Sequence, residues 1–417
     1  NTWGTGNAVI VIDGVPQSGY YYNGLNPMEV ESIVVLKDAM SKAMYGAMGD
    51  QGVILINTKQ GDIGPNKIRV SAQHSVLQSR AYPKFLNAAN YMERFNEART
   101  NDGLSPLYSQ NIIDKTRSRI SPALYPDEDF YTEDYLRKFR NNTNVFFDVS
   151  GGNQNTLYYV NTEWSTDNGW LNTSIPDKNN TFNFRGKLNF KINDYMRIGV
   201  SGVARLTTST FPNVNTDNWQ DGYWEAFSNI LPSAYPVLWD PNLITDLETR
   251  DRILENAILH KGMLLGGNSG YANNQIYGEL VQSGKVNYRQ GLAQFTGNAD
   301  VDLGFITEGL SFKAFAGINF YNTLYSEQRY QYAIYQPIDR SGTDMIDTVA
   351  IHGINVKRDQ FNTNNGESTY NRQFTYYSRL GYDRKFDAHE VSLSALLYGN
   401  TLTTEGAFQN QVRLHGG

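Results

Sequence analysis

The stretch FNFRGKLNFKI, residues 182–192, alternates without a break between two kinds of side chain. Its even positions are Phe182, Phe184, Gly186, Leu188, Phe190 and Ile192, and its odd positions are Asn183, Arg185, Lys187, Asn189 and Lys191. Successive side chains of a β-strand point to opposite faces, so the stretch predicts a strand with one apolar and one polar face. Its 11 residues also match the length that a tilted strand needs to cross a bilayer. We expect the even positions to face lipid, so that Leu188→Arg is costly and Lys187→Gln is mild.

The same period of two recurs along the chain from about residue 67. Copies lie at 68–78, 144–150, 156–166, 196–206, 293–305, 310–321, 374–384 and 389–400, which with 182–192 makes nine expected strands. Long segments (79–143, 167–181, 207–292 and 322–373) alternate with short ones (151–155, 193–194, 306–309 and 385–388) between these strands. Short turns on one side and long loops on the other are typical of a transmembrane β-barrel of the bacterial outer membrane. A soluble β-sandwich with one solvated face is the alternative.

The composition excludes several classes of protein and of functional site. Charged residues are only 19% of the 417 residues and aromatic residues are 13%, with 44 Asn. The net charge of −6 excludes a general nucleic-acid binder, which needs a basic face. The absence of cysteine excludes disulfides, thiolate metal centres and thiol nucleophiles, and the five histidines have no metal-ligand spacing. We therefore expect neither a metal nor a cofactor.

The first sixty residues differ from the rest. An apolar run at 8–12 ends in the turn pair Asp13-Gly14, and a second run at 53–58 predicts another strand. Between them, residues 38–45 have helical propensity and end at Gly46, a suitable C-cap. These signals predict a small α+β unit ahead of the long strands.

This unit resembles a known family. The sequences VIVIDGVP (9–16) and LNPMEVESIVVLKDAMSKAMYGAMGDQGVILINTKQG (25–61) resemble the plug domain of SusC/RagA-type TonB-dependent transporters of Bacteroidetes. The matching positions include Asp13, Gly14, Glu31, Lys37, Asp38, Tyr45, Gly46, Gly49 and Gly52. Downstream, residues 149–170 resemble an early barrel hairpin of the family, and SAYPVLWDPN (233–242) resembles part of one of its extracellular loops.

The resemblance implies a fold and a function. It implies an all-β transmembrane barrel of 22 strands around a small α+β plug, with residues 1–65 as the C-terminal part of the plug and 66–417 as the first nine or so strands. On this view the chain is the middle of a longer transporter. The implied function is import of a glycan or oligopeptide across the outer membrane, surrounded by outer-membrane lipid, energised by the TonB complex and covered by a SusD-like lipoprotein.

Two other functions stay open, and an enzyme is not expected. The chain has no GxSxG, HExxH or P-loop motif, and the acidic run at 126–129 is expected to be solvated surface. One alternative is a ligand-sensing receptor of the same fold. The other is a soluble β-rich carbohydrate-binding or hydrolytic module.

Two sets of residues are candidates for function. Glu31 and Asp38 are candidate partners for basic residues on the inner face of the barrel, unless those charges are simply solvated. Between 218 and 239, the aromatic residues Trp219, Tyr223 and Trp224 are candidates for substrate contact, because aromatic faces stack on sugars and peptide side chains. Trp239 lies in the family-like stretch and is expected to be structural. The alternative for the whole group is packing within the loop or against a lid.

Overall fold

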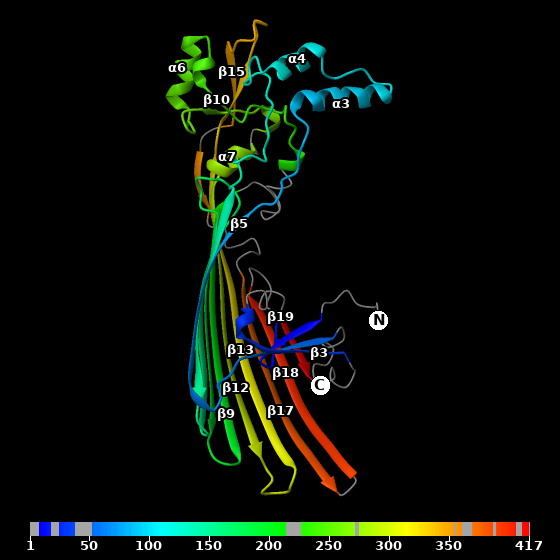
Figure 1. Ribbon diagram of the computed structural model, residues 1–417, viewed down its shortest axis with the longest axis vertical. Coiled ribbons are helices and arrows are strands. Elements are labelled where there is room, and N and C mark those ends of the chain that lie inside the picture. Colours follow the sequence, from blue (N-terminus) through cyan, green and yellow to red (C-terminus); the bar gives the residue numbers. More distant parts are fainter. Residues whose placement is uncertain are drawn as a thin grey trace.

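The computed structural model describes residues 8–17, 25–37, 52–213, 227–271, 275–353, 356–360, 369–386, 389–405 and 411–416. Two sheets dominate it: a small four-stranded sheet and a long, curved 11-stranded sheet, which we call the wall (Figure 1). Among the described helices, none is long and apolar enough to cross a membrane.

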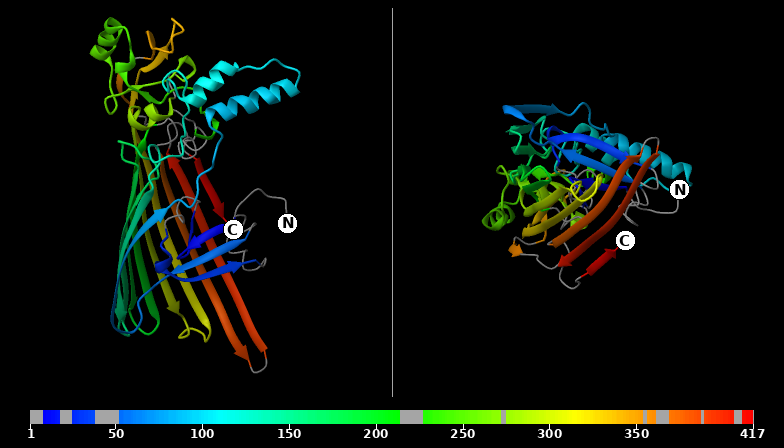
Figure 2. Two further views of the ribbon diagram at one scale, coloured as in Figure 1. Left: turned by 45° about the horizontal axis from the view of Figure 1, so that its top comes forward. Right: turned by 90° about the horizontal axis from the view of Figure 1, so that it is seen from below.

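The wall consists of antiparallel neighbours in the order β19-β18-β17-β13-β12-β9-β8-β7-β6-β5, with β16 pairing the far end of β13. Its long strands are β5 (Gly64–Gln78), β6 (Phe139–Gly152), β7 (Thr156–Asn168), β8 (Lys178–Lys191), β9 (Met196–Pro212), β12 (Gly284–Asp302), β13 (Leu310–Gln331), β17 (Tyr370–Phe386) and β18 (His389–Glu405). Each of the nine predicted strands lies within or overlaps one of them. The short β16 (Val356–Gln360) and β19 (Gln411–Gly416) complete the sheet. Figure 2 shows the wall as a curved surface with the small sheet on one side of it.

The two faces of the wall differ as the alternation predicts. On β8, Phe182 is 50% exposed and Leu188 is 38% exposed, although both are apolar. Arg185, on the opposite face, is only 4% exposed. Exposed apolar side chains on the outer face are the signature of a lipid-facing surface, so the predicted orientation of β8 is confirmed.

The connections also follow the predicted asymmetry. Short turns join β6 to β7, β8 to β9, β12 to β13 and β17 to β18 at one end of the wall, and all long connections lie at the other end (Figure 1). The long connections carry α3 (Ala88–Asn101), α4 (Gln110–Ser118), β10 (Leu238–Trp239), η3 (Pro241–Leu243), α6 (Leu247–Asn256), β11 (Leu264–Leu265), η4 (Ser269–Tyr271), α7 (Ile276–Val281), β14 (Ile334–Ile338) and β15 (Thr348–His352).

The long loops have a hydrophobic core of their own. The members of this loop core come from four connections: Phe130, Tyr135, Leu136, Leu171, Phe227, Tyr235, Val237, Leu265, Ile276, Tyr277, Leu280, Tyr332 and Ile334. Burying one such side chain stabilises a fold by about 1.5–3 kcal/mol. The loops therefore form a packed cap at the end of the wall.

The acidic run at 126–129 supports this cap. The Asp127 carboxylate accepts a hydrogen bond from the Ala88 N–H at the start of α3, at 2.7 Å. The Glu128 carboxylate accepts one from the Val237 N–H at 3.0 Å, while Asp129 is exposed. The expectation that the run is solvated surface is therefore wrong for Asp127 and Glu128, because both satisfy backbone donors in the cap.

Glu128 should make the stability of the cap depend on pH. Burial raises the pKa of this carboxyl above its usual value. A raised folded-state pKa means that the stabilising contribution is present at low pH and is lost as pH rises through that pKa. We expect Glu128→Gln, which keeps an acceptor for Val237, to slow exchange of the Val237 amide at pH 8 but not at pH 4. The exposed Glu133→Gln is the control, and an identical response in both variants would contradict the assignment.

The small sheet has the order β2-β1-β4-β3. Its strands are β1 (Val9–Ile12), β2 (Val15–Gln17), β3 (Val30–Leu36) and β4 (Val53–Thr58), and the 3-10 turn η1 (Pro27–Glu29) precedes β3. Strand β1 is parallel to β4 and antiparallel to β2. The helix expected at 38–45 lies outside the described residues.

Candidate functional site

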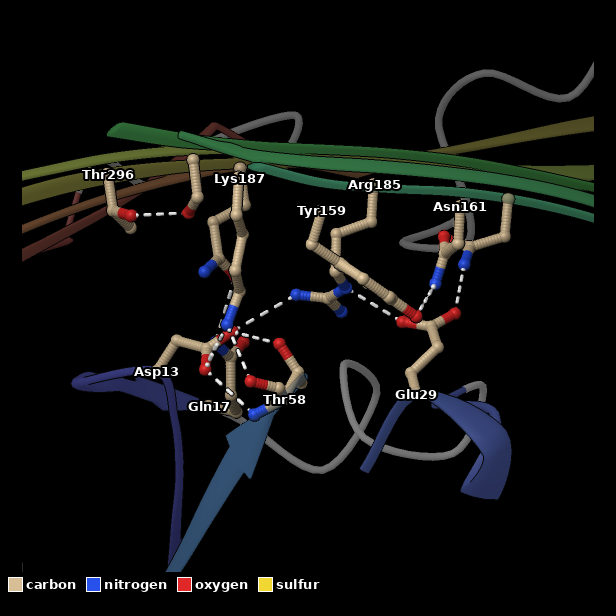
Figure 3. A network of polar contacts seen from close by, with 12 residues as sticks. Asp13, Gln17, Glu29, Thr58, Tyr159, Asn161, Arg185, Lys187 and Thr296 are labelled. Carbon is tan, nitrogen blue, oxygen red and sulfur yellow. Dashed lines mark hydrogen bonds and ion pairs between the residues drawn. The ribbon is translucent and has the colours of Figure 1, made fainter. Parts of the chain in front are cut away.

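The small sheet meets the inner face of the wall through a polar contact on β8, shown in Figure 3. Two carboxylates from the small sheet, Asp13 and Glu29, lie against two cations of the wall, Arg185 and Lys187. We call these four residues the charge clamp.

Asp13 occupies a two-residue hairpin between β1 and β2. Asp13 has φ +49° and Gly14 has φ +84°, which is the backbone that Asp-Gly turns of this kind favour. A Cβ on Gly14 would also lie 3.3 Å from the Phe315 ring, so the turn fits closely against the wall. The Asp13 carboxylate accepts hydrogen bonds from Thr58 N–H at 2.9 Å and Thr58 Oγ1 at 2.7 Å, which fixes its direction.

The wall approaches Asp13 with both cations. Lys187 Nζ donates to Asp13 Oδ1 and to the Thr58 carbonyl oxygen, each at 2.9 Å. Arg185 Nη1 lies 3.2 Å from Asp13 Oδ2. Since Arg185 and Lys187 are two residues apart on one strand, their side chains share a face and reach the same carboxylate.

Glu29 is the more deeply buried carboxylate, with an exposed fraction of 0%. It ends η1, which Asn26 caps by accepting the Met28 N–H at 2.8 Å. The two Glu29 oxygens accept from Arg185 Nε at 2.7 Å and from Asn183 Nδ2 at 2.5 Å. One guanidinium therefore holds both Glu29 and Asp13, two points 16 residues apart in the small sheet.

The clamp is electrically balanced, with two cations and two carboxylates. Its members are almost entirely withdrawn from water, so each charge depends on its partners. Removing one partner of a buried pair typically costs about 3–5 kcal/mol, although the intact pair adds little net stability. Such a contact favours one position of the small sheet, because its charges lose their partners when the small sheet moves from that position.

Beside the clamp, the contact is looser. Gln17 Nε2 donates to Gln294 Oε1 at 3.1 Å. Towards the short turns, a cavity of about 380 Å³ separates β1 and β4 from the wall. Lys187 and Asp13 line one part of it, and the exposed pair Asp300–Lys313, at 3.2 Å, lines another. The small sheet is thus tied to β8 by ion pairs, and the cavity separates part of it from β12 and β13.

The structure brings together only some of the predicted site residues. Asp13 and Gly14 lie in the contact, and Gly52 precedes β4 with φ +106°. Glu31 and Lys37 are exposed, and among the described residues Glu31 forms no ion pair with Arg185 or Lys187. Asp38, Tyr45, Gly46 and Gly49 lie outside the described residues, as do Trp219, Tyr223 and Trp224.

The sequence reasoning missed Glu29, Thr58 and Asn183. A local signal for the turn that carries Glu29 was present, because Asn26-Pro27 predicts a short capped turn. The partner of Glu29 could not be identified, because Glu29 and Arg185 are 156 residues apart and only the folded register joins them. The inward direction of Arg185 and Lys187 was predicted correctly.

The other aromatic residues of the 218–239 segment are structural. Phe227 and Tyr235 belong to the loop core. Trp239 is 3% exposed, and its Nε1–H donates to the Tyr335 carbonyl oxygen at 3.0 Å. The expectation that Trp239 is structural agrees with this burial.

A wall with a lipid-facing outer surface, long loops at one end and a small sheet clamped to its inner face defines a plugged outer-membrane β-barrel. No family model matches the chain. Curated relatives do: it is 28% identical over 251 residues to TonB-dependent receptor P26 and 27% identical over 424 residues to TonB-dependent receptor P39, both of Formosa agariphila. It is 24% identical over 253 residues to TonB-dependent receptor SusC of Bacteroides thetaiotaomicron.

These matches cover 56%, 92% and 55% of the chain, and 23%, 37% and 24% of the respective relatives. The fold is similar to that of the RagAB peptide transporter, with a TM-score of 0.60 and 17% identity over 98% of the chain and 45% of that structure. The resemblance seen in the sequence is confirmed: the chain is SusC/RagA-like and has the outer-membrane β-barrel fold of TonB-dependent receptors. The chain spans less than half the length of the proteins it matches.

Proposed function

We propose that the chain acts in TonB-dependent import of an oligomeric nutrient, a glycan or an oligopeptide, beneath a SusD-like surface lipoprotein. In this proposal residues 1–65 belong to the plug, and residues 66–417 supply about the first nine strands of a 22-stranded barrel. The observation that carries it is the charge clamp, because it ties the small sheet to the inner face of a lipid-facing wall. The names of the relatives, among them a peptide transporter and SusC, support import as the activity.

The chemistry of the clamp suits a plug that must move. Contacts made by ion pairs can be exchanged for contacts with water when a force separates the two surfaces. The polar cavity of about 380 Å³ already supplies a hydratable boundary beside the clamp. A pull on the plug would therefore have to break the Arg185 and Lys187 contacts before the remaining boundary opens.

The test is uptake of a labelled oligomeric nutrient by cells that express the protein as its only route of entry. Import should stop when the TonB complex is deleted, while binding of the nutrient at the cell surface persists. A SusD-like lipoprotein should co-purify. Uptake that continues without TonB would refute the proposal. Surface binding without any uptake in wild-type cells would favour the alternative, a ligand-sensing receptor of the same fold.

We also propose that Trp219, Tyr223 and Trp224 contact the nutrient. Replacing Trp219 and Trp224 together by Ala should weaken surface binding by about tenfold or more, since one aromatic contact contributes on the order of 1 kcal/mol. The control removes two aromatic residues at the opposite end of the wall, Tyr195 and Phe305, whose rings lie 5.4 Å apart near the short turns. Equal binding by both double variants, or loss of the lipoprotein from the tryptophan variant, would refute substrate contact.

A further inference from the structure

Three cations point outward near the loop end of the wall. Lys178 has the same parity on β8 as the lipid-facing Phe182, and Lys285 and Arg289 have the same parity on β12 as the exposed Phe295. Because side chains alternate along a strand, all three lie on the outer face. We call these three residues the cationic rim.

The register of the wall brings the rim together. Lys178 pairs with Thr210 of β9, and Thr210 pairs with Asn287 of β12, which lies midway between Lys285 and Arg289. Thr210 Oγ1 also donates to Asn287 Oδ1 at 3.0 Å, which places these side chains on one face. Strands lie about 4.8 Å apart, so the Lys178 backbone is about 10 Å from that of Asn287.

None of the described residues paired directly with the rim is acidic. The outward positions paired with these residues on neighbouring strands are neutral: Asn168, Thr208, Thr210, Pro212, Leu324, Ser326 and Gln328. The carboxylate next in sequence, Asp177, is directed to the Leu171 N–H at 3.5 Å. Among the described residues, no ion pair involves Lys178, Lys285 or Arg289.

The surfaces on either side of the rim differ in character. Towards the short turns lies the apolar outer face, where Phe182, Leu206 and Phe295 are each more than a third exposed. Towards the loops lies a pocket of about 610 Å³. Its lining combines Ile175, Pro176, Ile258, Val281 and Tyr330 with the polar Ser174, Gln282, Gln328 and Gln331, and it includes Lys285 of the rim.

We propose that this surface binds a phosphorylated glycolipid of the outer leaflet. The apolar outer face, the cationic rim and the pocket follow one another in the order of the parts of such a molecule. The acyl chains would lie on the apolar face, the phosphate on the cationic rim and the sugar in the pocket. Lys and Arg form strong, charge-assisted hydrogen bonds to phosphate. A pocket lined by a tyrosine and three glutamines has the residue types that stack on and hydrogen-bond to a sugar. The proposal rests on the outer-membrane location and does not depend on which nutrient is imported.

The experiment measures binding of the purified full-length protein, in mild detergent, to phosphatidylethanolamine vesicles that contain a minority of diphosphorylated lipid A. The test variant replaces Lys178, Lys285 and Arg289 together by Gln. The control variant replaces three exposed loop cations, Lys84, Arg94 and Lys261, by Gln and so loses the same charge. Heat-modifiable electrophoretic mobility verifies that each barrel is folded.

We expect the rim variant to lose affinity for these vesicles by at least tenfold, since each basic residue near an anionic surface contributes about fivefold. The control should stay within about twofold of wild type. If the triple variant does not fold, Arg289→Gln alone should still lose about fivefold. Equal binding by the rim variant, or equal binding of wild type to dephosphorylated lipid A, would overturn the proposal. Displacement by millimolar inorganic phosphate would show that the rim recognises a soluble anion, and would overturn the lipid assignment.

Discussion

Replacing Arg185 by Met is expected to destabilise the docking of the small sheet on the wall by about 3–5 kcal/mol. Met fills much of the volume of the Arg side chain but leaves Glu29, which is 0% exposed, with Asn183 as its one side-chain hydrogen-bond partner among the described residues. It also removes one of the two cations that hold Asp13. The measurement is hydrogen exchange of the β4 amides, which reports opening of the small sheet separately from the wall.

A double-mutant cycle distinguishes the loss of a partner from simple loss of packing. An unpaired buried charge on Glu29 would explain the loss of stability in Arg185→Met. In that case, Glu29→Gln in the Arg185→Met background should restore much of the stability, since replacing a whole buried pair by neutral groups is often nearly neutral. The matched control is Lys313→Met, because Lys313 pairs with Asp300 but its side chain is 55% exposed. Its effect should stay within about 1 kcal/mol. Additive effects of the Glu29 and Arg185 variants would contradict the clamp.

The wall was predictable from sequence because its signal is repeated and local. Alternation alone located all nine long strands, and the parity of Phe182 and Arg185 fixed which face each side chain takes. Strand ends were less predictable: β12 begins at Gly284 and β13 ends at Gln331, both beyond the expected limits of 293 and 321. These extensions pair with each other above the lipid-facing region, where no apolar alternation is needed.

The clamp was predictable only in part, because it depends on contacts distant in sequence. Glu29 was not among the sequence candidates: it lies in the turn before β3, next to the shift in register between Val30 and Ser32, and local sequence does not show which way it points. The contacts of Lys187 argue against the expectation that Lys187→Gln is mild. Lys187 is not a solvated lumen charge but a donor to Asp13 and Thr58, and a glutamine would carry no charge to balance Asp13.

Replacing Leu188 by Arg is expected to destabilise the wall by about 2–4 kcal/mol, the cost of placing a basic residue near the bilayer midplane on the lipid face of a barrel. Leu188 is one position from the centre of the 182–192 alternation. Its cross-strand neighbours are Tyr158 and Val200, which share its outward face and offer no carboxylate. The measurement is the free energy of unfolding from urea titration of the barrel reconstituted into vesicles.

The neighbouring residue supplies the control for this variant. Asn189 lies on the opposite face and lines the polar cavity of about 380 Å³. A shift of one residue along a strand moves a side chain from lipid to the interior, so Asn189→Arg adds the same charge to a hydratable space. That variant should cost less than about 1 kcal/mol. An equal loss of unfolding free energy at 188 and 189 would mean that β8 does not separate lipid from a polar interior. The cationic rim of Lys178, Lys285 and Arg289 could then not be assigned to a lipid-facing surface.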